Sequence, residues 1–151
     1  MADAFADRPV RRVGIARHPI SSILLPVPIV CFIGALLTDF AYEGSGGNLL
    51  WLNFSSWLLA AGLLIGAIAG LLMLIDFARL GQLRSAQGWG AFALLVAAWI
   101  VELINSFVHA RDGWTAVDPL GLILSIIGVV LILIYGWLWH ETRYDVDGGR
   151  P

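Results

Sequence analysis

Four long stretches of apolar residues, separated by short polar segments, restrict what this chain can fold into. A helix needs about 20 apolar residues to cross the hydrocarbon core of a bilayer. In this sequence of 151 residues, 59% are hydrophobic and only 13% are charged. The apolar stretches lie at about 20–39, 54–77, 89–108 and 120–139. We therefore predict an all-α integral membrane protein with four transmembrane helices in contact with the lipid bilayer.

The short connectors and the arginine distribution predict the topology. Neighbouring helices joined by ten to fifteen residues pack side by side, so we expect an up-down antiparallel bundle at 18–140, between tails at 1–17 and 141–151. The two tails and the 76–87 loop hold eight of the nine arginines, and the other connectors hold only Arg111. By the positive-inside rule, both termini face the cytoplasm.

Two features of the apolar stretches predict how the helices pack. Pro26 and Pro28 interrupt the first one, so we expect a proline-kinked helix whose straight part begins near Pro26. Gly62, Gly66 and Gly70 lie on one face of the second, where another helix can approach closely. We favour a helix of the same chain over a second copy as that partner. The lone cysteine, Cys31, is interpreted as a small apolar residue.

The third stretch carries polar residues at helical spacing. Glu102, Asn105 and His109 fall on one helix face, and Glu102 lies about 10 Å below the outer end of that helix. We expect Glu102 to point into the bundle, where Thr38 and Ser125 can bond to it. The candidate polar cluster on the outer, periplasmic side comprises Asp39, Glu102, Asn105, His109, Arg111 and Asp112.

This outer cluster has two interpretations. In the structural one, Glu102 joins the helices through hydrogen bonds. In the functional one, Glu102, Asn105 and His109 form a short relay for protons or an ion. For His109, Arg111 and Asp112 we expect a solvated cap of mutually paired side chains, with a ligand or partner contact as the alternative.

At the inner end, His18, Asp76 and His140 form a second candidate cluster, on the cytoplasmic side. Two histidines at one depth can ligate a haem, so haem b is an alternative. Neither His18 nor His140 lies inside its apolar stretch, however, where a haem pocket would need it. We predict no cofactor and no metal, because the carboxylates and histidines are too dispersed for a specific site.

Other classes of function have no support in the sequence. It contains no phosphate-binding glycine loop, no G-x-S-x-G and no H-E-x-x-H, and its formal net charge of −2 does not suggest a nucleic-acid partner. Most tryptophans lie at the ends of the apolar stretches, as interfacial anchors do, whereas Trp99 is interior. We expect no enzymatic activity.

Several motifs resemble those of a known family. They are His18-Pro19 before Leu25-Pro26, Asp39 at the far end of the same helix, WLNFSSWLLAAG at 51–62 and INSFVHARDGW at 104–114. Over residues 15–140 the chain resembles the bacterial predicted inner-membrane proteins grouped as domain of unknown function 2231. The resemblance implies a four-helix bundle in the bacterial inner membrane, and it implies no activity.

The sequence as a whole favours a small accessory or scaffolding subunit of a membrane assembly. Its partners would be other membrane subunits or a second copy of the chain. The alternative is a membrane redox component that binds haem, or a proton or ion relay that uses Glu102 and the histidines.

Overall fold

The computed structural model describes residues 23–80, 86–111, 117 and 119–148, and these contain helices and no strands. Each helix contains a segment that is long and apolar enough to cross a membrane. The helices are α2 (Pro26–Gly44), α3 (Leu49–Leu80), α4 (Ala86–His109) and α5 (Leu120–Gly148). The prediction of an all-α fold with four membrane-spanning helices is therefore confirmed.

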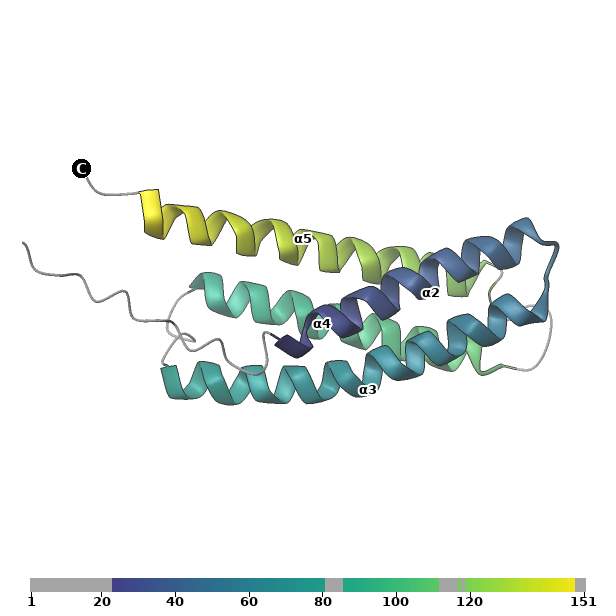
Figure 1. Cartoon of the computed structure of the whole chain (residues 1–151), viewed down its shortest axis with the longest axis horizontal. Helices are drawn as coiled ribbons and strands as arrows, with labels where there is room; N and C mark the ends of the chain where they lie inside the picture. Colours follow the sequence, from purple (N-terminus) through teal and green to yellow (C-terminus); the bar gives the residue numbers. More distant parts are fainter. Residues whose placement is uncertain (1–22, 81–85, 112–116, 118, 149–151) are drawn as a thin grey trace, which may run out of the picture.

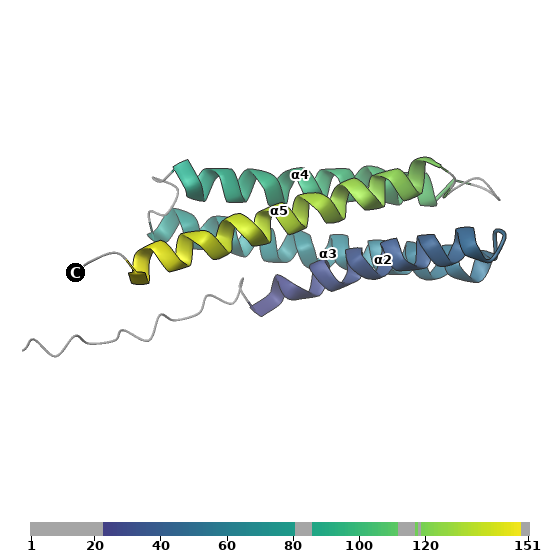
Figure 2. The ribbon, with the colours of Figure 1, turned by 90° about the horizontal axis from the view of Figure 1, so that it is seen from above.

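The four helices form an up-down bundle in which α2 packs on α3, α3 on α4, α4 on α5 and α5 on α2. Figures 1 and 2 show the end of α2, the start of α3, the end of α4 and the start of α5 at one end of the bundle, which we call the turn end. The other end, the terminal end, holds the start of α2, the end of α3, the start of α4 and the end of α5.

The α2–α3 connector is shorter than the sequence led us to expect. Hydropathy suggested a connector at 39–53, but α2 continues to Gly44 and α3 begins at Leu49. A helix satisfies its own backbone and can continue past the apolar region into the interface, which a hydropathy profile does not detect. The chain reverses at Gly46 and Gly47, whose φ angles of 72° and 90° suit glycine.

The prolines determine where α2 begins. Residues 23 and 24 are helical, Leu25 forms a turn, and the uninterrupted helix starts at Pro26, as the proline positions predict. A proline at the start of a helix lacks only an amide hydrogen that would have had no partner. Consequently α2 starts short of the terminal end, whereas the adjacent ends of α3, α4 and α5 extend further (Figure 1).

The apolar core lies where small residues let helices approach. Its buried residues are Phe32, Ala35, Leu59, Leu63, Ala98 and Ile132. A Cβ atom on Gly62 would lie only 2.7 Å from Cε1 of Phe32, and one on Gly66 would lie 3.2 Å from Cδ1 of Trp99. A Cβ on Gly70 would have no described atom within 4 Å, apart from its chain neighbours and the backbone of its own helix. The close contacts at Gly62 and Gly66 are thus made by helices of the same chain.

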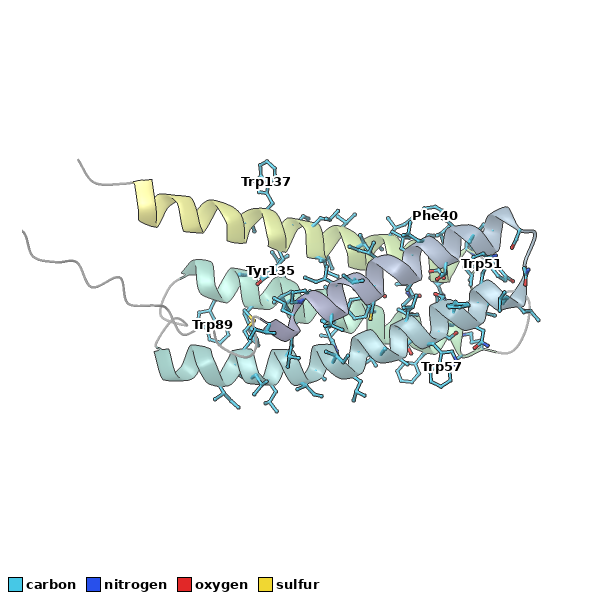
Figure 3. The ribbon with its side chains drawn as sticks, in the orientation of Figure 1. Phe40, Trp51, Trp57, Trp89, Tyr135 and Trp137 are labelled. Carbon is cyan, nitrogen blue, oxygen red and sulfur yellow. The ribbon has the colours of Figure 1, made fainter. Side chains whose placement is uncertain are left out.

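The tryptophans follow the expected division between outside and inside. Trp57 and Trp137 are 72% and 69% exposed and point away from the bundle, while Trp51 and Trp89 lie towards opposite ends of it (Figure 3). Exposed aromatic rings of this kind suit the interface between membrane and water. Trp99 is half-buried against the core, and its Nε1 donates a hydrogen bond of 3.0 Å to the carbonyl oxygen of Leu63.

Candidate functional site

A cluster of buried polar side chains, contributed by all four helices, lies towards the turn end of the bundle. His109 is 4% exposed and the others are fully buried. Because successive helices run in opposite directions, the last turns of α2 and α4 meet the first turns of α3 and α5 at this depth. We call this set the polar cluster; it consists of Asp39, Ser55, Glu102, Asn105, His109 and Ser125.

Asp39 is the centre of the polar cluster. Its Oδ1 accepts a hydrogen bond of 2.6 Å from Oγ of Ser55 on α3, and its Oδ2 accepts one of 2.5 Å from Oγ of Ser125 on α5. Nε2 of His109 on α4 lies 2.9 Å from Oδ1. One carboxyl group on α2 therefore bonds to each of the other three helices.

Asn105 connects the rest of the cluster. Its Nδ2 donates to Oγ of Ser125 at 2.8 Å and to Oε2 of Glu102 at 3.1 Å. Because the only hydroxyl proton of Ser125 goes to Asp39, Oγ of Ser125 must accept from its other neighbour. This requirement fixes the amide orientation, with the nitrogen of Asn105 facing Ser125.

The hydrogen bonds of His109 define how its protons are shared. Nδ1 lies 3.0 Å from the carbonyl oxygen of Asn105, and because a carbonyl can only accept, Nδ1 carries a proton. One further proton then lies between Nε2 of His109 and Oδ1 of Asp39. The pair is neutral overall whether that proton resides on the imidazole or on the carboxyl group. Such a pair avoids much of the cost of burying a net charge.

Two oxygens of the polar cluster are not satisfied. Oε1 of Glu102 and Oδ1 of Asn105 are buried and have no hydrogen-bond partner among the described residues. Leaving a buried acceptor without a partner costs about 1–3 kcal/mol. The side chain of Glu102 lies against Gly128, where an added Cβ would be 2.7 Å from Cδ of Glu102 and closer still to Oε1. Gly128 thus leaves the space that Glu102 occupies.

The structure brings together four of the residues predicted for the outer cluster: Asp39, Glu102, Asn105 and His109. Arg111 is exposed beyond the end of α4, and Asp112 lies outside the described residues. The prediction of a solvated cap is wrong for His109, which is buried against Asp39. Sequence spacing could not indicate that these two residues meet, because they lie 70 positions apart on different helices.

The partners expected for Glu102 are also different. Thr38 donates to the carbonyls of Gly34 and Ala35 in its own helix. Ser125 bonds to Asn105 and Asp39, so Glu102 is held through Asn105. The hydroxyl of a helical threonine can readily reach the carbonyl three or four residues earlier, and this local bond prevails here.

The inner candidate cluster falls outside what the structure describes. His18 precedes the described residues, and Asp76 and His140 belong to α3 and α5 but their side chains are not described. Among the described residues, no group of three or more His, Cys, Asp and Glu side chains is arranged to hold a metal ion.

Ser55 was not predicted as a site residue. The sequence has two adjacent serines, and only the helix orientation decides which one faces inward. Ser55 is fully buried and bonds to Asp39, whereas Ser56 donates to the carbonyl of Leu52 in its own helix. The available signal was the spacing of Ser55 and Leu59, one turn apart and both core residues.

Comparison with known proteins agrees with the membrane fold and with the resemblance seen in the sequence. The family described as "Predicted membrane protein (DUF2231)" matches residues 17–149, which is most of the chain. No curated protein and no solved structure matches the chain.

Proposed function

The chain belongs to the DUF2231 family of predicted membrane proteins, and we propose that it is a non-enzymatic accessory subunit of the bacterial inner membrane whose polar cluster binds and releases a proton at the outer face. Four membrane-spanning helices with short described connectors support the first half of this proposal. The chemistry of the polar cluster supports the second half.

The arginine distribution supports the orientation. Eight of the nine arginines lie in the tails and the 76–87 loop, which in the sequence adjoin the helix ends found at the terminal end of the bundle. The positive-inside rule assigns such an end to the cytoplasm, so the polar cluster lies near the periplasmic side. The exposed residue Arg111 lies two residues after the end of α4 at that side.

The observation that carries the proposal is the presence of three ionisable side chains, Asp39, Glu102 and His109, in one buried network. Hydroxyls and amides alone can join membrane helices. An ionisable residue inside a membrane helix costs about 2.5–3.5 kcal/mol at the helix centre and less towards the interface, and such residues are usually functional. The network therefore contains more acid-base chemistry than helix packing requires.

The geometry favours proton binding over proton conduction. The side-chain hydrogen bonds that link Glu102 to the Asp39–His109 pair run through the Asn105 amide, which donates to both Glu102 and Ser125 and does not readily pass a proton from one to the other. The proton between Asp39 and His109 has a short path, since the two atoms that share it are 2.9 Å apart. The titratable groups within the cluster come from α2 and α4, while α3 and α5 contribute the hydroxyls of Ser55 and Ser125.

Infrared difference spectroscopy between pH 5 and pH 8, the range in which histidine typically titrates, tests the proposal in protein reconstituted into nanodiscs. We expect a change in the carbonyl stretch of a protonated carboxyl group, lost in Asp39→Asn and changed in Glu102→Gln. Glu43→Gln is the matched control, because Glu43 is an exposed acid on the same helix as Asp39. Difference spectra that are identical in the wild type, Asp39→Asn and Glu102→Gln would contradict proton binding by this cluster.

The accessory role needs a separate test. Purification in mild detergent followed by size analysis and mass spectrometry is expected to recover a defined membrane partner or a second copy of the chain. A solitary monomer at native expression level would contradict the accessory role while leaving proton binding intact.

Haem ligation is not part of the proposal. Both ring nitrogens of His109 are already bonded, to Asn105 and to Asp39, so His109 has no free nitrogen for an iron atom. His18 and His140 remain as candidates from the sequence alone. An absorption spectrum of the purified protein with a Soret band would revive the redox alternative.

A further inference from the structure

A cavity of about 250 Å³ lies between the helices in the half of the bundle nearer the terminal end. Its lining is almost entirely apolar and comes from all four helices, and it includes Phe32, Met73, Phe92, Trp99 and Ile132. For scale, a closed apolar cavity of about 150 Å³ can bind benzene. The cavity is therefore large enough for part of an apolar ligand, and its lining has few groups that could form hydrogen bonds with a polar ligand.

The position of the cavity along the helices limits what can enter it. One end reaches the core residues Phe32 and Ile132 in the middle of the bundle. The other end reaches Leu74, two residues before Asp76, the first charged residue beyond the apolar part of α3. From Gly66 to Leu74 the lining spans about 12 Å of helix. The cavity thus runs from the level of the interface into the hydrocarbon.

The cavity also opens to the outside of the bundle. Leu71, Leu74 and Val96 line it and are 60%, 39% and 39% exposed. These residues lie within membrane-spanning segments, so the opening faces lipid hydrocarbon. Leu25, just before α2, and Pro28, in its first turn, also line the cavity.

We propose that this cavity binds one acyl chain of a phospholipid from the leaflet at the terminal end. The lining suits hydrocarbon, and the end of the cavity lies at the level where a phospholipid ester group would be. The two tails and the 76–87 loop carry eight arginines and six acidic residues, whereas the segments 39–53 and 109–119 carry one arginine and four acidic residues. This charge difference complements an anionic headgroup, so phosphatidylglycerol is the lipid of choice for the test.

The test uses the full chain in nanodiscs of phosphatidylglycerol, with a trace of the same lipid carrying a diazirine at the end of one acyl chain. After illumination, mass spectrometry locates the cross-links. We expect labelling of Phe32 and Ile132, which line the deep end of the cavity and are only 4% and 5% exposed. Labels confined to outward-facing residues such as Leu64, which is 66% exposed, would overturn the proposal.

Two matched variants sharpen the result. Gly70 lines the cavity and Gly136 does not. At both positions an added Cβ would have no described atom within 4 Å, apart from its chain neighbours and the backbone of its own helix. Gly70→Leu should fill the space and lower the labelling of Phe32 and Ile132 at least tenfold, while Gly136→Leu should leave it unchanged. Equal labelling in both variants would overturn the proposal. If Gly70→Leu does not fold, the position of the wild-type cross-links still decides the question.

Discussion

The two halves of the bundle fill the space between the same four helices in different ways. Towards the turn end, hydrogen bonds that converge on Asp39 connect α2 to α3, α4 and α5. Towards the terminal end, an apolar cavity remains between them. Hydrogen bonds have strict geometry, whereas apolar contacts depend mainly on volume. The polar half should therefore tolerate few substitutions, and the half with the cavity should tolerate added volume.

The largest effect is expected from Asp39→Leu. This change removes three hydrogen bonds, each contributing about 0.6–1.7 kcal/mol in a membrane protein, and leaves His109 buried without its partner. We expect the free energy of unfolding to fall by roughly 2–5 kcal/mol. Unfolding in mixed micelles, followed by circular dichroism, measures the change.

Thr38→Val is the control for that experiment. Thr38 lies one residue from Asp39, but its hydroxyl bonds only to the carbonyls of Gly34 and Ala35. Its loss should change the free energy of unfolding by less than about 0.5 kcal/mol. Equal losses in Asp39→Leu and Thr38→Val would show that the polar cluster does not hold the helices together.

Gly128→Ala and Gly70→Ala compare the two halves with the same chemical change. A Cβ on Gly128 collides with the side chain of Glu102. Gly70 lines the cavity, and a Cβ there would have no described atom within 4 Å, apart from its chain neighbours and the backbone of its own helix. Gly128→Ala should lower the free energy of unfolding by about 1–3 kcal/mol. Gly70→Ala should leave it unchanged or raise it by up to about 1 kcal/mol, because alanine favours a helix.

A double-mutant cycle identifies the cause of the Gly128→Ala effect. If the collision with Glu102 is responsible, Glu102→Ala should cancel most of the loss caused by Gly128→Ala. Additive losses in the double variant would mean that Gly128 matters for another reason.

The sequence predicted the fold well because each helix is encoded locally. The lengths of the apolar stretches predicted four spans, and Pro26 predicted the start of the first uninterrupted helix. Helix ends were less accurate: Gly44 and Leu49 lie beyond the apolar stretches, in a region where polar residues are also compatible with a helix. The family was recognisable from short motifs spread over the chain.

The candidate site was only partly predictable from the sequence. Helical spacing was sufficient to group Glu102 with Asn105 and His109, because all three lie on α4. The central position of Asp39 and the contribution of Ser55 depend on how α2 and α3 are rotated about their axes. Such rotations follow from packing between helices and cannot be read from a single helix. The cavity could not be predicted for the same reason.

Ser55→Ala and Ser56→Ala should separate a bond between helices from a bond within one. Ser55 donates to Asp39 across the bundle, and Ser56 donates to the carbonyl of Leu52. Since Oδ1 of Asp39 keeps His109 as a partner, Ser55→Ala should cost about 1 kcal/mol. Ser56→Ala should cost close to nothing. Thermal unfolding of both variants in the same detergent provides the comparison, and a larger loss for Ser56→Ala would mean that the helix is oriented differently.

The smallest effect is expected from Trp99→Phe, at the boundary between the two halves. Trp99 donates to the carbonyl of Leu63 and also lines the cavity. The substitution keeps an aromatic ring and removes one hydrogen bond, so the free energy of unfolding should fall by about 0.6 kcal/mol. Unfolding in the presence and absence of added phosphatidylglycerol measures it. If an acyl chain packs against Trp99, the smaller ring should also reduce the stabilisation by lipid, which Ser55→Ala, in the polar half, should not do.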